Sequence, residues 1–134
     1  MLKRIDLGFA QLEIHDRYVV GRTQEGVEVD PAAHSRALEE VRKYIAPPFG
    51  IIIDEVNSYS IACGVLEQIR NDPDIACCAA VIYRKITEVV LTPAGRFVKK
   101  PYGFFDSLPE AEAWVLSILD DLSVAEEEAE SQSQ

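Results

Sequence analysis

The stretch FGIIIDEVNSYSIACGVLEQIR, residues 49–70, decides how this sequence folds. Its first part, 49–54, is almost continuously apolar, which is typical of a central strand covered on both faces. After a polar, turn-forming segment, Ile61, Val65 and Ile69 recur at four-residue spacing, the pattern of one helix face. The stretch therefore predicts a buried strand, a loop and then a helix of about ten residues.

A second buried strand is predicted over residues 75–83, IACCAAVIY, which are again continuously apolar. The turn residues Asn71, Asp72 and Pro73 separate it from the preceding helix. Two buried strands joined by a helix form a right-handed crossover unit. We therefore expect 49–54 and 75–83 to be adjacent parallel strands.

The remaining elements complete an α/β pattern. Residues 9–15 and 17–23 flank a short turn, and the first of them alternates apolar and polar side chains, which predicts a leading hairpin. Asp30 and Pro31 are the residues expected at a helix start. We further expect a helix over 84–91, an extended segment over 97–105 that is irregular at Pro101, and a closing helix after Ser107. The predicted fold is α/β, with a mixed β-sheet of about five strands, a leading hairpin and about four helices.

The closing helix carries the clearest local signal. Ser107 and Glu110 have the spacing of a capping box, which satisfies two amides at a helix start. Trp114 lies on the apolar face that follows, and we expect it to anchor that face in the core. The tail after Val124, AEEEAESQSQ, lacks large apolar residues. We therefore expect a single domain over 1–124 and an acidic disordered tail over 125–134.

The charge of the chain limits its partners. The formal net charge is −10, and the last 15 residues carry six acids and no base. Nucleic acids and anionic membranes require clustered Lys and Arg side chains, so neither is an expected partner. No apolar run approaches the roughly 20 residues that span a bilayer, and the first residues do not resemble a signal peptide. We expect a cytoplasmic protein without membrane insertion; its oligomeric state is not predicted.

Few residues suggest catalysis or metal binding. The two histidines and three cysteines are not at zinc-ligand spacing, and Cys77 and Cys78 lie in an apolar run, where free cysteines usually act as small apolar side chains. Cys63, near a helix start, is the one candidate nucleophile. We therefore expect no metal, no cofactor and no enzymatic activity, and an uncharacterised enzyme is the least favoured alternative.

Two segments resemble the STAS domain, the family of sulfate transporters and anti-sigma-factor antagonists. YGFFDSLPEAEAWVLSIL, residues 102–119, is similar to the closing strand and helix of bacterial stand-alone STAS/SEC14-like proteins of unassigned function. IIIDEVNSYSIACGVLEQI, residues 51–69, has the strand–loop–helix layout of that family. The resemblance implies a STAS-like (SEC14-like) fold from about residue 6 to residue 120.

The same resemblance implies a regulatory protein-interaction module. In anti-sigma-factor antagonists, a partner kinase phosphorylates a serine where the helix after the central strand begins. Ser60 stands at that position, whereas Tyr59, Ile61 and Ala62 stand where the family has Asp, Ser and Gly. The expected interaction site is Ser58, Tyr59 and Ser60, and the expected partner is a protein such as an anti-sigma-type kinase. From the residues alone, either serine could instead be only a helix N-cap.

An alternative function is the binding of a small apolar, lipid-like ligand, by analogy with SEC14-like carriers. Its candidate residues are Phe97, Tyr102, Phe104 and Phe105, which surround an irregular strand. Ordinary core packing would place aromatic residues there equally well. A large apolar cavity lined by these side chains would favour ligand binding.

Overall fold

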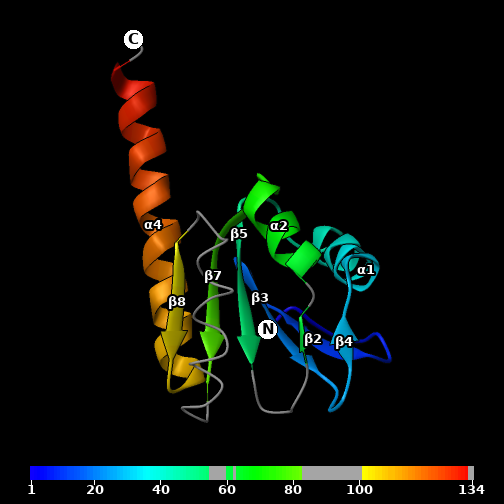
Figure 1. Cartoon of the computed structure of the whole chain (residues 1–134). Coiled ribbons are helices and arrows are strands. Elements are labelled where there is room, and N and C mark those ends of the chain that lie inside the picture. The colour runs from blue at the N-terminus through cyan, green and yellow to red at the C-terminus, as the bar shows by residue number, and fades with distance from the viewer. Residues whose placement is uncertain (55–59, 62, 83–100, 133–134) are drawn as a thin grey trace.

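The computed structural model contains a six-stranded mixed sheet with helices on both faces (Figure 1). It describes residues 1–54, 60–61, 63–82 and 101–132. In spatial order, the strands are β1 (Lys3–Asp6), β2 (Ala10–Ile14), β3 (Tyr18–Thr23), β5 (Phe49–Asp54), β7 (Ile75–Val81) and β8 (Tyr102–Phe105). Strands β1 to β3 are antiparallel, whereas β3, β5, β7 and β8 are parallel neighbours.

The described helices divide between the two faces of this sheet. Helices α1 (Pro31–Arg42) and α2 (Cys63–Asn71) cover one face, and α4 (Leu108–Gln132) covers β5, β7 and β8 on the other (Figure 1). A separate two-stranded parallel ribbon joins β4 (Glu28–Val29) to β6 (Ser60–Ile61), immediately before α1 and α2 respectively. The result is a three-layer arrangement with two apolar clusters, one on each side of the sheet.

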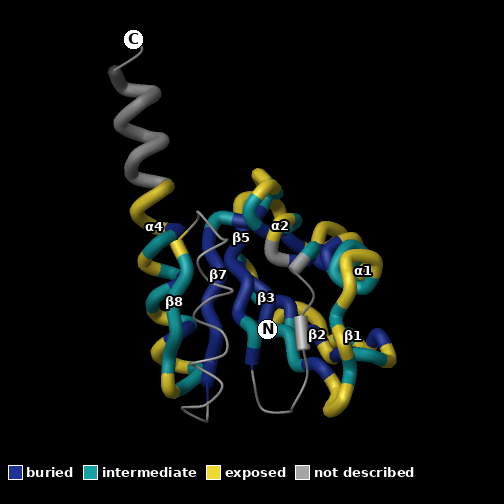
Figure 2. Tube along the Cα trace, viewed as in Figure 1, coloured by how far each residue is buried: buried dark blue, intermediate teal, exposed yellow. Residues whose placement is uncertain are grey.

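Strands β5 and β7 form the buried centre of the sheet, as the two apolar runs predict (Figure 2). They are adjacent and parallel. Ile51 contributes to the cluster beneath α1 and α2, and Ile52 contributes to the cluster beneath α4. Continuous apolarity is therefore explained by burial on both faces, and the crossover prediction is confirmed.

The predicted hairpin and helix starts are also confirmed. Strands β2 and β3 pair antiparallel. Asp30 caps α1, because its carboxylate accepts a hydrogen bond of 2.8 Å from the amide of Ala33. At the start of α4, the hydroxyl of Ser107 accepts from the amide of Glu110 at 3.4 Å. These caps satisfy first-turn amides that have no partner within the helix.

The buried face of α4 differs from the predicted one in its anchor. Ala111 and Val115 are completely buried and Leu119 nearly so, whereas Trp114 is only partly buried. Trp114 packs its ring against Phe105, with 5.4 Å between the ring centroids, at the β8 edge of the sheet. Small side chains at the centre of α4 let the helix approach the sheet closely, so the large aromatic residue lies at the border.

Several features differ from the expectation or lie outside it. Strand β1 and the β4–β6 ribbon were not predicted, because both are too short to show a period in the sequence.

The stretch 125–134 was expected to be disordered, yet α4 continues through Gln132. Alanine and glutamate are strong helix formers, and they extend a helix that packing has already nucleated. The helix predicted over 84–91 lies outside the described residues.

The contact between Gly50 and α4 provides a test of the packing. A Cβ atom at Gly50 would lie 2.3 Å from Cγ1 of Val115 and 3.3 Å from Sγ of Cys77. We expect Gly50→Ala to lower the free energy of unfolding by about 1–3 kcal/mol, the usual cost of overpacking a core. Urea unfolding measures this loss. Val115→Ala removes the methyl group that would clash with the new Cβ atom. The double variant should therefore lose less unfolding free energy than the two single variants lose in sum, and strictly additive losses would contradict the contact.

Trp114 and the end of α4 should contribute unequally to stability. Replacing a core aromatic residue by alanine costs about 3–5 kcal/mol, and partial exposure places Trp114→Ala near the lower end, at about 3 kcal/mol. The last turns of α4 extend away from the sheet (Figure 1), so deletion of 125–134 should leave the melting temperature unchanged. Thermal melts compare the two variants, and equal losses would show that the terminal turns stabilise the domain.

Candidate functional site

The carboxyl ends of the parallel strands place a buried acid beside an arginine. Open α/β sheets commonly bind ligands and partners at this edge. Strand β5 ends at Asp54, which is only 2% exposed, and β3 brings Arg22 alongside it. The Nε of Arg22 donates to Oδ2 of Asp54 at 2.8 Å. Desolvation makes a buried carboxylate costly unless a partner of opposite charge compensates it, and Arg22 supplies that charge.

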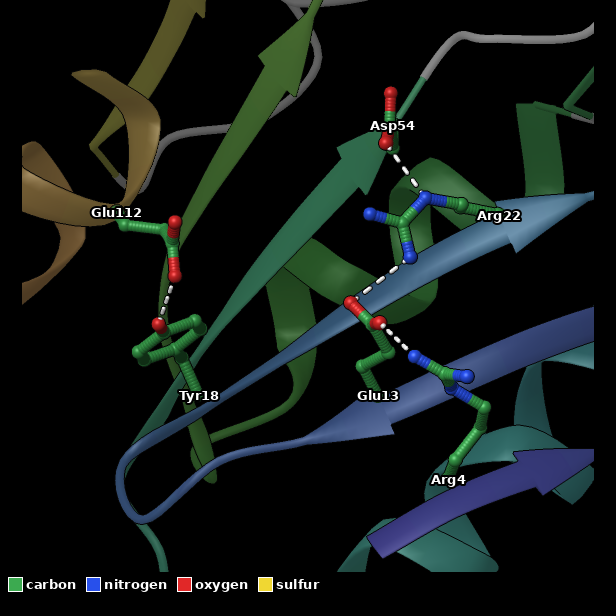
Figure 3. Close-up of polar contacts among 6 residues, drawn as sticks. All are labelled: Arg4, Glu13, Tyr18, Arg22, Asp54 and Glu112. Atoms are coloured by element: carbon green, nitrogen blue, oxygen red, sulfur yellow. Dashed lines mark hydrogen bonds and ion pairs between the residues drawn. The ribbon is translucent and has the colours of Figure 1, made fainter. Parts of the chain in front are cut away.

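This ion pair ends a chain of four alternating charges that crosses four strands (Figure 3). Arg4 lies directly opposite Glu13 in the β1–β2 register and donates to it at 2.9 Å. Arg22 donates to the other oxygen of Glu13 at 2.8 Å and to Asp54. Glu13 alternates with Leu12 and Ile14 of the cluster under α1 and α2, so the charged chain lies on the α4 face of the sheet.

The ion pairs of this charged chain fix the charge state and the orientation of its side chains. Hydrogen bonding from Arg22, with further help from Arg4, holds the pKa of Glu13 below its usual value, and burial only partly opposes this. Within the described part of the chain, Oδ1 of Asp54 is buried and has no hydrogen-bond partner. Asp54 thus presents one acceptor atom at the strand end from which the segment containing Ser58 departs.

The structure does not place the predicted serine site as expected. Ser58 and Tyr59 lie outside the described residues. Ser60 belongs to β6, where it pairs with Glu28 of β4, and α2 begins three residues later at Cys63. The helix start was expected at Ser58 or Ser60; Ser60 does not lie in the first turn of α2, because pairing with β4 extends the backbone at this point.

The ribbon nevertheless leads into the place where two helices begin. A Cβ atom at Gly64 would lie 2.9 Å from Cγ of Pro31, so the first turns of α1 and α2 are in contact. Ser60 lies in β6, which precedes α2, and its ribbon partner Glu28 lies in β4, which precedes α1. Of the three residues of the predicted interaction site, the structure thus places Ser60, in the ribbon that leads into the starts of both helices.

The aromatic residues of the alternative function do not come together. Phe97 lies outside the described residues. Tyr102 and Phe104 share one face of β8, with 5.2 Å between their ring centroids, whereas Phe105 packs on Trp114 at the opposite face. Successive strand residues point to opposite faces, so neighbouring aromatic residues cannot all line one pocket.

An apolar cavity does occur, but in a different place. It lies between the sheet and helices α1 and α2, has a volume of about 90 Å³, and is lined by side chains such as Phe9, Leu38 and Ile69. Ligand pockets in proteins usually measure roughly 300–1,000 Å³. The cavity is therefore too small for a lipid chain, and no pattern in the sequence pointed to it.

The described residues offer little for catalysis. Burial raises the pKa of the Cys77 thiol to about 11, so this thiol stays protonated and unreactive at neutral pH. His15, on the polar side of the hairpin, stacks on Tyr18 with 4.5 Å between ring centroids. Among the residues that the structure describes, no cluster of His, Cys, Asp or Glu side chains could hold a metal ion. Nor does any described helix have the length and apolarity needed to cross a membrane.

Comparison with known proteins identifies the fold. No protein-family profile matches the sequence, and no curated protein matches it significantly. Among solved structures, the chain is similar to an uncharacterised DUF3478-family protein with a SpoIIAA-like fold from Shewanella loihica PV-4. The two are 11% identical, with a TM-score of 0.58 over 83% of this chain and 97% of the other. The chain therefore has a SpoIIAA-like, STAS-like fold, as the resemblance implied.

The charged chain predicts how stability depends on pH. The pKa of Glu13 is lowered in the folded protein, so its contribution is present at neutral pH and is lost as the pH falls below the unfolded value of about 4.5. We expect the Glu13→Gln variant to lose less unfolding free energy between pH 7 and pH 3.5 than the wild type does, as measured by urea unfolding. The exposed acid Glu25 supplies the control: Glu25→Gln should retain the wild-type difference. Identical losses in all three proteins would contradict the role of Glu13.

Proposed function

We propose that this protein is a non-enzymatic regulatory module that binds a partner protein, in the manner of an anti-sigma-factor antagonist. The binding surface would comprise residues 58–60 together with the ribbon and the first turns of α1 and α2. The position of Ser60 supports the proposal, because this serine lies in the ribbon that leads into the junction of the two helix starts. The SpoIIAA-like fold is consistent with such a role but does not establish it.

Phosphorylation would change the charge of this surface without requiring a new fold. A phosphoserine adds about −1.5 to −2 charges at neutral pH. Glu28, an exposed acid, pairs with Ser60 in the ribbon, so the added charge would lie beside an existing negative charge. A partner that docks through acidic groups would then be repelled. The ribbon hydrogen bonds involve the backbone, so they would survive the modification.

The expected partner is a protein kinase of the anti-sigma type, which would both bind and phosphorylate the module in the cytoplasm. No cofactor is part of the proposal. A lipid carrier is the weaker candidate, because the aromatic residues Tyr102, Phe104 and Phe105 divide between two faces and the cavity beneath α1 is small.

The switch can be tested with matched variants of Ser60. We expect Ser60→Asp to keep the wild-type melting temperature but to lose a partner that Ser60→Ala still binds. Quantitative affinity purification from cells of the source organism compares the proteins captured by each variant. Ser117→Asp is the control for added charge, because Ser117 is an exposed position on α4.

Mass spectrometry of the protein isolated from the same cells should also detect a phosphopeptide that contains Ser58 or Ser60. If Ser60→Asp and Ser60→Ala capture the same proteins, or neither captures any above background, the proposed switch is refuted. If Ser117→Asp loses the partner as well, total charge rather than this surface controls binding.

A further inference from the structure

Strand β1 is an open edge of the sheet. It stands first in the strand order, and among the described strands it pairs with β2 alone. Three of its four residues are exposed, and Ile5 is partly buried. Met1 and Leu2, directly before the strand, are large apolar residues that are 63% and 52% exposed. The backbone groups of an open edge can pair with another strand, so such edges are either protected or used for binding.

The pairing of β1 with β2 determines which backbone groups face outward. At the end of this pair, the amide of Leu7 donates to the carbonyl of Ala10 at 2.9 Å. Bonded and non-bonded positions alternate along an antiparallel pair, so every second residue back from Leu7 directs its amide and carbonyl to β2. The intervening residues, Arg4 and Asp6, direct theirs to the open edge. A further strand would therefore have to pair with these two residues.

The side chains of the same two residues carry opposite charges on one face of the sheet. Arg4 donates to Glu13 at 2.9 Å and is still 62% exposed (Figure 3). It is the outermost member of the chain of alternating charges, so the group that would continue the series is an acid. Asp6 accepts from the amide of Gly8 at 2.8 Å. A carboxylate has about four acceptor sites, so Asp6 can accept from an arginine as well.

A second copy of β1 matches this edge in one register. Two identical strands related by a two-fold axis are antiparallel, and their outward residues can meet in three ways: Arg4 opposite Arg4, Asp6 opposite Asp6, or Arg4 opposite Asp6 on both sides of the axis. The first two place like charges directly opposite each other, which is destabilising, whereas the third forms two pairs of opposite charge. The sequence of the edge is thus complementary to itself.

The apolar residue of the strand fits the same register. Ile5 lies between Arg4 and Asp6, so it would stand on the two-fold axis and face its own copy. Its side chain packs against the cluster under α1 and α2, on the opposite face from the charges. Directly opposite residues at a non-hydrogen-bonded position bring their side chains closest, so the two isoleucines would cover each other.

We propose that β1 pairs antiparallel with β1 of a second copy of this chain, which joins two six-stranded sheets into one across a two-fold axis. Arg4 of each copy binds Asp6 of the other, and the two Ile5 side chains meet on the face of α1 and α2. The contact is short, so the dimer is weak and forms reversibly with concentration. The proposal depends neither on phosphorylation nor on the partner proposed for Ser60.

Amide hydrogen exchange of the full-length protein tests which edge pairs. Raising the protein concentration toward about 1 mM should slow exchange at the outward amides of Arg4 and Asp6. The amides of Lys3 and Ile5 should not respond, because they already bond to β2. Sedimentation equilibrium over the same range measures the Kd of the dimer. Both use about 0.15 M salt, which screens the repulsion between two copies of net charge −10.

Charge reversal tests the register. Asp6→Arg places cations opposite Arg4 on both sides of the axis and leaves the Arg4–Glu13 pair in place. We expect it to raise the Kd of the dimer about tenfold or more, and Arg4→Asp to act likewise. An equal mixture of the two variants should dimerise again, because the charge at position 4 of each chain then faces its opposite at position 6 of the other. Asp121→Arg, at an exposed position on α4, is the control for net charge and should dimerise at least as well as the wild type.

Four results would overturn the proposal. One is a wild-type protein that stays monomeric up to about 1 mM. Another is a dimer in which exchange at Arg4 and Asp6 is unchanged, since a different surface would then form the contact. The third is an equal Kd for Asp6→Arg and Asp121→Arg. The fourth is a mixture of folded Asp6→Arg and Arg4→Asp that dimerises no better than either alone. If Arg4→Asp does not fold, the first three results still decide the matter.

Discussion

The structure depends on the burial of β5 and β7 on both faces. Small residues make this possible: Gly50, Cys77 and Ala79 bring the sheet close enough to α4 for Val115 to fill the space above them. A Cβ atom added at Gly50 would overlap Val115, so the distance between sheet and helix is set by these residues. With α4 on one face, the apolar residues of the other face must be covered as well, and α1 and α2 cover them.

The placement of α4 also explains the charged chain. This helix packs mainly on β5, β7 and β8 and also contacts the start of β3, so it leaves β1 and β2 on the same face without a described helix. Charged side chains such as Glu13 and Arg22 occupy that side, and they reach across the strands to Asp54. At the border, the hydroxyl of Tyr18 donates a hydrogen bond to Glu112 (Figure 3). Arg17 pairs with Asp120 at 2.6 Å, so two polar contacts link α4 to the hairpin.

The sequence predicts those features that depend on the local pattern of residues or on the order of the elements along the chain. Continuous apolarity marks β5 and β7, alternation marks β2, and the caps at Asp30 and Ser107 mark helix starts. The Arg22–Asp54 pair could not be predicted, because its 32-residue separation becomes a contact only once β3 and β5 are known to be neighbours. The structure of Ser60 was mispredicted for a related reason: its partner β4 is two residues long and leaves no periodic signal. The hydrogen bond between Gln68 and Ser35 likewise forms only through the packing of two separate helices.

Helices α1 and α2 are held against each other at two points. Pro31 and Gly64 are in contact at the helix starts, and the amide of Gln68 donates to the hydroxyl of Ser35 about one turn further along. The pairing of β4 with β6 fixes the two backbone segments that lead into these starts. The strand pairing and the side-chain contacts therefore set the arrangement of the two helices together, and a change of charge on a side chain of the ribbon would leave its backbone hydrogen bonds in place.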